Sequence, residues 1–266
     1  MYKFALFGSI TLILLCLLAS YSFSGAKEKP AFDKFDKKNV NIGELSINTR
    51  DNLILLVKYY ISKNKENSPV VILLHMLGKD NSSWNKFIPL LLNNGYAVYS
   101  VDMRGHGKSV ETLDKKSNYF QTMTDGNWLK MPDDVSDLIN FISKDKTVDS
   151  SNIALIGASI GANSAIIAAS EHPDKVKTTV ALSPGLNYRG IEILKSAENL
   201  KTPILIATSQ NDDYSYKSSN QLNKAVKVEH DLLIYEGNEH GTNLLNQSEE
   251  LMSKIISWLN EHIEKK

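Results

Sequence analysis

The sequence is poor in cysteine and carries no net charge, and these two shortages exclude several classes of protein. Its single cysteine, Cys16, lies in an apolar N-terminal stretch, so a mature chain without that stretch would contain neither disulfides nor a thiolate nucleophile. The 30 lysines and arginines equal the 30 aspartates and glutamates in number. No net field therefore draws the chain toward nucleic acid or an anionic membrane, and we expect no nucleic-acid partner.

Proline and glycine are scarce as well, with 7 and 14 residues among 266, while 42% of the residues are apolar. This composition is typical of a globular protein and not of a disordered or fibrous one. The length allows one large domain with a sizeable core, and no internal repeat or second domain is evident. No histidine, cysteine or aspartate residues cluster at metal-ligand spacing, and the dinucleotide pattern G-x-G-x-x-G is absent. We therefore expect no metal and no cofactor.

Residues 1–26 differ in kind from the rest of the chain. Residues 4–19 are almost wholly apolar, and Ser24 and Ala26 fit a small-x-small cleavage site. This pattern predicts a secretory signal peptide, so the mature protein would be exported: periplasmic, at the cell surface or secreted. Two alternatives stay open, namely residues 4–19 as an uncleaved membrane anchor and a lipoprotein signal that uses Cys16. In each case the chain would contact a membrane only through this segment.

After this segment the chain alternates between strand and helix patterns. Residues 27–39 form a polar lead-in, and residues 40–266 form one domain. Within it, residues 40–60 predict an antiparallel hairpin, and the apolar run 69–74 predicts a strand covered on both faces. Apolar residues between 84 and 91 then recur at helical spacing. Buried strands that alternate with amphipathic helices predict an α/β architecture with a mostly parallel sheet, whose ligand site lies outside the carboxyl ends of the strands.

The strongest functional signal is the stretch 153–162. A short buried strand is followed by a G-x-S-x-G turn and then by a helix pattern. A serine on such a sharp turn has a strained backbone and an outward-pointing hydroxyl, which makes Ser159 a candidate nucleophile. Gly157 and Gly161 suit the turn because a side chain there would collide with the strand or helix alongside. The N–H of Ile160, at the start of the helix, points where charge would develop on an attacked carbonyl.

A serine nucleophile needs a base and an orienting acid, and both should lie in loops after later strands. Asp212 follows the predicted strand 203–208, and His240 follows the predicted strand 232–235. The order Ser…Asp…His, each at a strand's end, is that of a known catalytic triad. Asp213 is adjacent to Asp212 and could be the acid instead.

From about residue 40 to residue 264 the chain resembles the α/β-hydrolase superfamily, through four motifs in the expected order. The resemblance implies an α/β-hydrolase fold, with a mostly parallel central sheet and helices on both faces. The first two motifs are the oxyanion-loop sequence His75-Met76-Leu77-Gly78 and, after the next strand, Asp102-x-Arg104-Gly105-His106-Gly107-x-Ser109. The other two are the elbow Gly157-Ala158-Ser159-Ile160-Gly161 and the sequence Glu239-His240-Gly241, which contains the candidate general base.

The resemblance also implies roles for individual residues. Ser159 would be the nucleophile, His240 the general base and then acid, and Asp212 the orienting carboxylate. The oxyanion hole would consist of the backbone N–H groups of Ile160 and Leu77.

Met76 is the one departure from the family's pattern, because the family usually has glycine at this position. Methionine needs a less permissive backbone, so the resemblance defines this loop less well than the elbow. His75, beneath the loop, is predicted to pack and hydrogen-bond and not to catalyse. His106 is predicted to shape the Gly-flanked loop that contains it.

The stretch between residues 182 and 203 is too short for the helical cap that many relatives insert there. We therefore expect an open site that suits small or extended substrates and not a deep, lidded pocket. The predicted walls are apolar or aromatic and carry few charges. They are Met76, Met103, Trp128, Leu186, Tyr188 and Tyr214.

These observations predict a serine hydrolase that cleaves a carboxylic ester or a related acyl bond of a small molecule through an acyl-enzyme. An acyltransferase or a peptidase could use the same triad. A non-catalytic binding protein on the hydrolase fold is the alternative from another class, but such a role would not require serine, aspartate and histidine together.

Overall fold

The structure is a computed structural model that describes residues 37–265. The predicted signal peptide, the alternative anchor 4–19 and Cys16 lie outside the described residues. The strands are β1 (Val40–Asn48), β2 (Ile54–Ser62), β3 (Ser68–Leu74), β4 (Ala97–Val101), β5 (Val148–Ala158), β6 (Val176–Leu182), β7 (Asn187–Tyr188), β8 (Ile191–Glu192), β9 (Ile204–Ser209) and β10 (His230–Tyr235).

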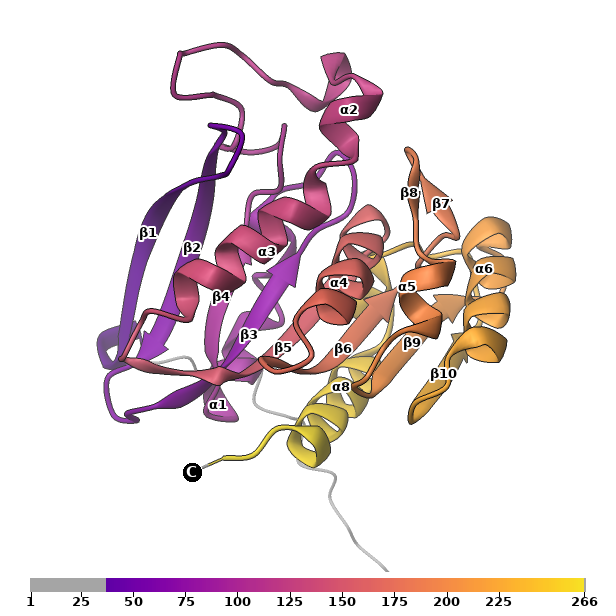
Figure 1. Ribbon diagram of the computed structural model, residues 1–266. Coiled ribbons are helices and arrows are strands. Elements are labelled where there is room, and N and C mark those ends of the chain that lie inside the picture. Colours follow the sequence, from indigo (N-terminus) through magenta and orange to yellow (C-terminus); the bar gives the residue numbers. More distant parts are fainter. Residues whose placement is uncertain (1–36, 266) are drawn as a thin grey trace, which may run out of the picture. The chain divides into compact units, whose positions relative to one another are not determined.

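The α-helices are named in Figure 1 where there is room for a label. They are α1 (Ile88–Asn93), α2 (Asp125–Trp128), α3 (Met131–Ile142), α4 (Ile160–Glu171), α5 (Leu194–Glu198), α6 (Asp213–Ala225), α7 (Asn243–Gln247) and α8 (Glu249–His262). Three short 3₁₀ helices are η1 (Lys37–Asn39), η2 (Asn81–Trp84) and η3 (Phe120–Thr122). Among the described residues, no helix has the length and apolar character needed to span a membrane.

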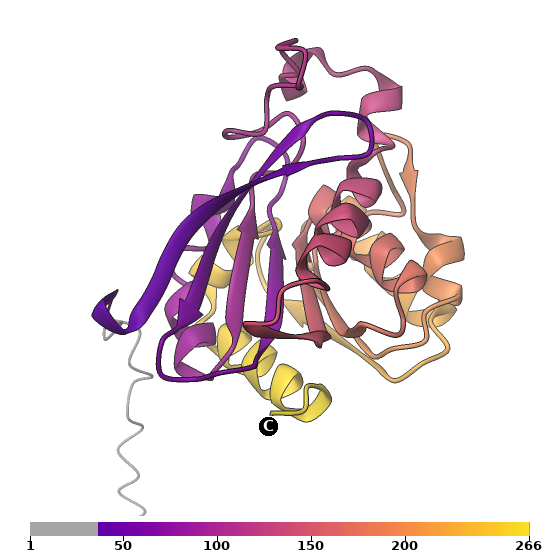
Figure 2. The same cartoon turned by 60° about the vertical axis from the view of Figure 1, so that its left-hand side comes forward.

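An eight-stranded sheet organises the domain, in the order β1-β2-β4-β3-β5-β6-β9-β10. The hairpin β1–β2 and the pair β2–β4 are antiparallel, and every later pairing in this sheet is parallel. Figure 2 shows the long β1–β2 hairpin at one edge of the sheet. The predicted hairpin and the predicted mostly parallel sheet are both confirmed.

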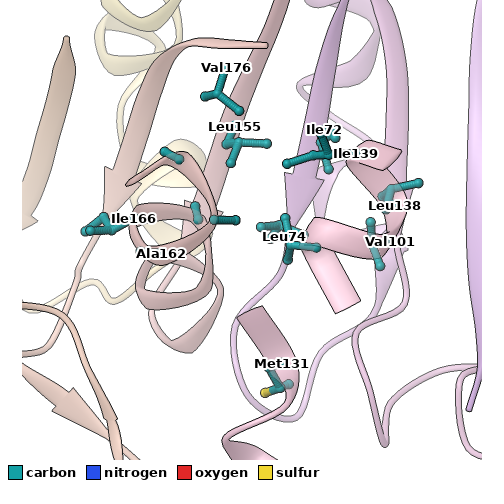
Figure 3. Close-up of a cluster of buried hydrophobic side chains, with 14 of the residues drawn as sticks. Ile72, Leu74, Val101, Met131, Leu138, Ile139, Leu155, Ala162, Ile166 and Val176 are labelled. Carbon is teal, nitrogen blue, oxygen red and sulfur yellow. The ribbon is translucent and has the colours of Figure 1, made fainter. Parts of the chain in front are cut away.

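Helices cover both faces of this sheet, as Figures 1 and 2 show. Alternate residues of each strand supply the two cores, because successive side chains point to opposite faces. On one face Ile72 and Leu74 of β3 pack with α3 and α4, as seen in Figure 3. On the other face Val71 and Leu73 pack with η2, α1, α7 and α8. Burial on both faces explains why β3 is apolar along almost its whole length.

The helix predicted between residues 84 and 91 is divided into η2 and α1. Pro89 stands in the first turn of α1, where it has no N–H to continue a preceding helix. Trp84 ends η2, and Phe87 precedes α1. All three apolar side chains at Trp84, Phe87 and Leu91 are nonetheless buried, so the spacing predicted the covered face correctly and the length of the helix wrongly.

Gly161 allows α4 to approach β3 closely. A Cβ at this position would lie 2.5 Å from the carbonyl oxygen of Leu74 and 2.6 Å from that of His75. Gly157 is equally confined, since its Cβ would lie 2.3 Å from the carbonyl oxygen of Gly161. The two glycines of the G-x-S-x-G turn are therefore required by backbone contacts that cannot shift, as the sequence predicted.

We expect Gly161→Ala to lower the free energy of unfolding by about 1–3 kcal/mol, because the added methyl overlaps backbone atoms and forces α4 away from β3. Urea titration of the purified variant measures this change. Gly126→Ala in α2 is the matched control, since the atom nearest to its added Cβ is 3.8 Å away. Equal stability of the two variants would contradict the packing argument.

Candidate active site

Ser159 lies exactly between β5 and α4, where the chain turns sharply from strand to helix. Its backbone angles are φ 55° and ψ −120°, and a positive φ is costly for a residue with a side chain. Its N–H donates to the carbonyl of Leu182 at 2.8 Å, which ties the turn to the end of β6. The residue is 5% exposed. The sheet and α4 thus hold Ser159 in a conformation that it would not adopt unaided.

Asp212 and His240 are brought together by the ends of β9 and β10. His240 Nδ1–H donates to Asp212 Oδ2 at 2.6 Å, which leaves Nε2 to accept a proton. Asp213 begins α6, and its side chain is exposed. The geometry therefore selects the first of the two adjacent carboxylates as the partner of the imidazole.

The electrostatics of Asp212 favour its charged form. Burial raises the pKa of this carboxyl, but the hydrogen bond and charge of His240 lower it, and so does the polar surrounding that Ser215 provides. The net effect places the pKa of Asp212 below its ordinary value. A carboxylate that stays ionised can stabilise the imidazolium that forms when His240 takes a proton.

The loop after β3 leaves the Leu77 N–H uncommitted. The Gly78 N–H donates to His106 Nε2 at 3.0 Å, and the Lys79 N–H donates to the Met76 carbonyl at 3.2 Å. No hydrogen bond among the described residues uses the Leu77 N–H. The N–H of Ile160, in the first turn of α4, also has no partner within its helix. Both of the N–H groups predicted for the oxyanion hole are thus available.

Met76 takes an ordinary backbone conformation, since positive φ values in this loop are confined to Gly78 among the described residues. Its side chain is 8% exposed and packs on Gly241, whose Cβ would lie 2.7 Å from the Met76 sulfur. The departure from glycine thus places a thioether beside the loop that contains His240, without strain at residue 76.

His75 and His106 hold the two loops together and contact no triad member in hydrogen bonds. His75 Nδ1–H donates to the Met76 carbonyl at 2.8 Å, and its Nε2 accepts from the Met103 N–H at 2.9 Å. His106 is built the same way, with Nδ1–H donating to the Arg104 carbonyl at 2.9 Å. Burial lowers the pKa of His75 to about 3 and also lowers the pKa of His106. Both rings act as neutral acceptors for backbone N–H groups.

These two histidines predict a loss of stability in mild acid. Below the ordinary histidine pKa of about 6.5, these histidines bind protons in the unfolded chain but stay neutral in the folded chain. The free energy of unfolding therefore falls as the pH falls. For His75 the loss continues down to a pH of about 3, where the folded ring also protonates. Urea titrations between pH 7.5 and 5 should show this decline, with a smaller slope in His75→Gln. Stability that is flat over this range in the wild type would contradict the assignment.

Arg104 anchors the loop after β4. Its guanidinium is 2% exposed and bonds both carboxylate oxygens of Asp51 at 2.8 Å and both of Asp134. The hydrogen bond from Arg104 is the main cause that holds the pKa of Asp51 well below its usual range. Asp102, at the start of the same loop, accepts from the N–H groups of Asn81 and Lys108. The motif after β4 therefore serves to fix the backbone around the site.

The predicted wall residues divide into three groups. Met103 and Trp128 are buried in the same apolar cluster as Ile160, and Leu186 and Tyr188 pack against that cluster. Met76 lies in the cluster on the other face of the sheet. Tyr214 is 47% exposed, and its hydroxyl bonds the backbone N–H and carbonyl of Asn187. The structure thus brings Tyr188 to the triad and leaves the Tyr214 side chain on the outer surface.

The segment between β6 and β9 contains the small hairpin β7–β8 and the short helix α5. The segment before α3 reaches this hairpin. The Arg189 guanidinium lies 5.3 Å from the centre of the Trp128 ring, and a Cβ on Gly190 would lie 3.3 Å from Leu129. Figure 1 shows α2 and β7–β8 beyond the same end of the sheet. Two segments far apart in the sequence thus meet at this end of the sheet.

Three polar residues that the sequence did not single out support the site. Ser183 Oγ accepts from the Gly241 N–H at 2.9 Å, beside His240. Asn163, which is wholly buried, donates to the carbonyls of Gly185 and Ile191. Ser215 Oγ lies 2.9 Å from Tyr188 Oη and 3.4 Å from His240 Nδ1. Of the three, only Asn163 had a recognisable signal, since it is a polar residue in an otherwise apolar and small-residue helix.

Serine on an elbow, a histidine–carboxylate pair and two free N–H groups, all at the carboxyl ends of strands, define the class of the protein. The chain belongs to the alpha/beta hydrolase fold family, whose model matches residues 69–254. Within residues 37–265, no group of three or more histidine, cysteine or acidic side chains is placed to hold a metal ion.

Individual relatives and solved structures are similar to the chain. A 2-(acetamidomethylene)succinate hydrolase of Mesorhizobium japonicum is 25% identical over 171 residues, which cover 64% of this chain and 51% of the relative. The match thus spans about half the length of that curated relative. An esterase of Pyrococcus furiosus superposes with a TM-score of 0.67 at 20% identity, covering 87% of this chain and 95% of the esterase. A dienelactone hydrolase of Anabaena variabilis gives a TM-score of 0.64 at 14% identity, covering 84% and 97%.

Proposed function

We propose that the protein is a serine hydrolase that cleaves a carboxylic ester or a related acyl bond of a small molecule. The observation that carries this proposal is the Asp212–His240 hydrogen bond of 2.6 Å, on the same edge of the sheet as a serine held at φ 55°. The names of the relatives, which include two hydrolases and an esterase, support acyl-bond hydrolysis as the reaction class.

The first half of the proposed reaction forms an acyl-enzyme. Ser159 Oγ attacks the carbonyl carbon of the substrate, and its proton passes to His240 Nε2. The carbonyl oxygen becomes an oxyanion that the N–H groups of Ile160 and Leu77 stabilise. His240 then donates its proton to the leaving oxygen as the bond to the acyl carbon breaks. Asp212 holds the imidazole in the required tautomer and balances its charge throughout.

The second half releases the acyl group. Water gives a proton to His240 Nε2 and attacks the acyl carbon, and His240 then returns this proton to Ser159 Oγ as the acyl–serine bond breaks. The His240 side chain is 35% exposed, so water can approach it. No step requires a metal or a cofactor.

Reaction with a fluorophosphonate probe tests this proposal, because the probe phosphonylates only an activated serine. We expect stoichiometric labelling that peptide mass spectrometry maps to Ser159, together with turnover of p-nitrophenyl esters. A panel of esters with increasing acyl length would then define the substrate. A folded protein that the probe leaves unlabelled and that cleaves no ester would refute the proposed function.

A further inference from the structure

Tyr188 is more than a wall of the site, because its hydroxyl joins a set of polar atoms around the triad. Its Oη lies 2.9 Å from Ser215 Oγ and 3.4 Å from the carbonyl oxygen of Ser183. Its ring meets the His240 ring edge-on, with centroids 6.3 Å apart. A residue that only bounded a pocket would need none of these polar contacts.

Ser215 links Tyr188 to the histidine. Ser215 stands in the first turn of α6, three residues after Asp212, and its Oγ lies 3.4 Å from His240 Nδ1. A hydroxyl can donate one proton and accept others. The Ser215 hydroxyl therefore bonds the phenol on one side and faces the imidazole on the other.

The phenol keeps its proton at neutral pH. Burial raises the pKa of Tyr188 to about 12. Its proton is therefore available to Ser215 Oγ or to the Ser183 carbonyl, both of which lie within hydrogen-bond distance of Tyr188 Oη. A chain of polar contacts thus runs from Tyr188 through Ser215 to His240 Nδ1.

This chain of contacts also affects which oxygen accepts the hydrogen bond from His240. Its Nδ1–H has two oxygens within reach, those of Asp212 at 2.6 Å and Ser215 at 3.4 Å. Donation from Tyr188 occupies a lone pair of the Ser215 oxygen and makes that oxygen a less available acceptor for the Nδ1–H. The carboxylate then remains as the acceptor for the imidazole, which is the arrangement that catalysis requires.

The fold holds Tyr188 in place through the segment 185–191. Asn163 binds this segment from inside α4, Ser218 Oγ accepts from the Leu186 N–H at 3.1 Å, and Tyr214 bonds the backbone of Asn187. The ring itself fills the space beside Gly185, where a Cβ would lie 2.5 Å from it. The position of the phenol is thus imposed by four separate contacts.

We propose that Tyr188 is a positioning residue of the triad. Its hydroxyl, acting through Ser215, keeps the His240 imidazole aligned on Asp212. The inference rests on the proposed serine mechanism, and it adds a tyrosine and a serine to the three residues that the mechanism names.

Tyr188→Phe tests this inference because it keeps the ring and removes only the hydroxyl. We expect kcat for p-nitrophenyl acetate to fall about tenfold, the value of one well-made hydrogen bond, with KM changed less than twofold. The rate of fluorophosphonate labelling should fall by a similar factor. Tyr96→Phe is the matched control, since its hydroxyl bonds Asn260 in α8, away from the triad, and it should keep wild-type kcat.

Ser215→Ala extends the test to the middle of the chain. We expect it to lower kcat about as much as Tyr188→Phe, and we expect the double variant to be no worse than about either single one, because both changes break the same chain. A double variant that loses the product of the two factors would overturn the inference. Should Tyr188→Phe fold poorly, Ser215→Ala alone decides, and a kcat within twofold of wild type overturns the inference.

The remaining outcomes separate the inference from the function on which it rests. A labelled wild type with Tyr188→Phe of unchanged kcat, or with a raised KM only, would overturn the positioning role and leave the serine mechanism intact. A wild type that is neither labelled nor active would overturn the serine mechanism and the inference together.

Discussion

Ser159→Ala is expected to lower kcat/KM for an activated ester by about 10⁴-fold or more. The expectation follows from the proposed chemistry, since the alanine side chain has no atom that can form the acyl-enzyme. The oxyanion donors at Ile160 and Leu77 would remain, so the residual rate reports what binding and polarisation achieve without a nucleophile. Steady-state kinetics on p-nitrophenyl acetate, with highly purified protein, measures the loss.

A second serine in the same helix supplies the control for this experiment. Ser170 Oγ donates to the carbonyl of Ile167 near the end of α4, far along the helix from the elbow. Ser170→Ala should keep wild-type kinetics, and both variants should keep the far-UV circular dichroism of the parent. Activity within tenfold of wild type in a folded Ser159→Ala would remove Ser159 from the mechanism.

Asp212→Asn is expected to lower kcat by about 10³–10⁴-fold. The asparagine amide is isosteric with the carboxylate, but it carries no charge and can present N–H groups to the imidazole. His240 then loses both the balancing charge and the fixed tautomer that leaves Nε2 free to take the serine proton. Measurement of kcat on one activated ester, across the pH range in which the protein stays folded, determines the effect.

The neighbouring carboxylate provides the comparison. Asp213 is exposed at the start of α6 and makes no hydrogen bond to His240 in the described part of the chain. Asp213→Asn should therefore change kcat by less than about tenfold, because a screened surface charge affects substrate approach at most. The opposite ranking of the two variants would mean that the acid lies one residue later in the chain.

The elbow and the two partner residues could be predicted because their signals are local in the sequence. Gly157 and Gly161 stand at fixed offsets from the serine, and the contacts that forbid their replacement come from the strand and helix on either side. Asp212 and His240 each follow an apolar strand pattern at short distance. The parallel sheet converts these sequence positions into one spatial cluster, so a topology inferred from pattern was enough to bring them together.

The supporting residues could not be predicted, because their roles depend on contacts between distant segments. Ser215 is an ordinary polar residue in the first turn of an amphipathic helix until Tyr188 and His240 are both placed beside it. Ser183 supports the site only because the fold places the Gly241 N–H within hydrogen-bond distance of its hydroxyl. A sequence pattern does not encode which of many serines will face such a partner.

The contact between the segment before α3 and the hairpin β7–β8 could not be predicted for the same reason. The segment before α3 has no periodicity of its own, and its α2 turn is short. Its position follows from Arg189 against Trp128 and from Phe120 stacked on His106 at a centroid distance of 4.4 Å. Local propensity carries no information about such contacts, so the sequence did not predict them.

The place of β10 in the sheet has a consequence for how activity would be lost on heating. Among the described strands β10 pairs only with β9, and its residues are partly or fully exposed, with Ile234 at 45%. Edge elements with few buried contacts open at lower free energy than the core of the same domain. Because the loop after β10 contains His240, local opening of this one strand would displace His240. Activity would then be lost while β3 and β5 remain folded. Amide exchange should be faster in β10 than in β3, and inactivation should precede global melting.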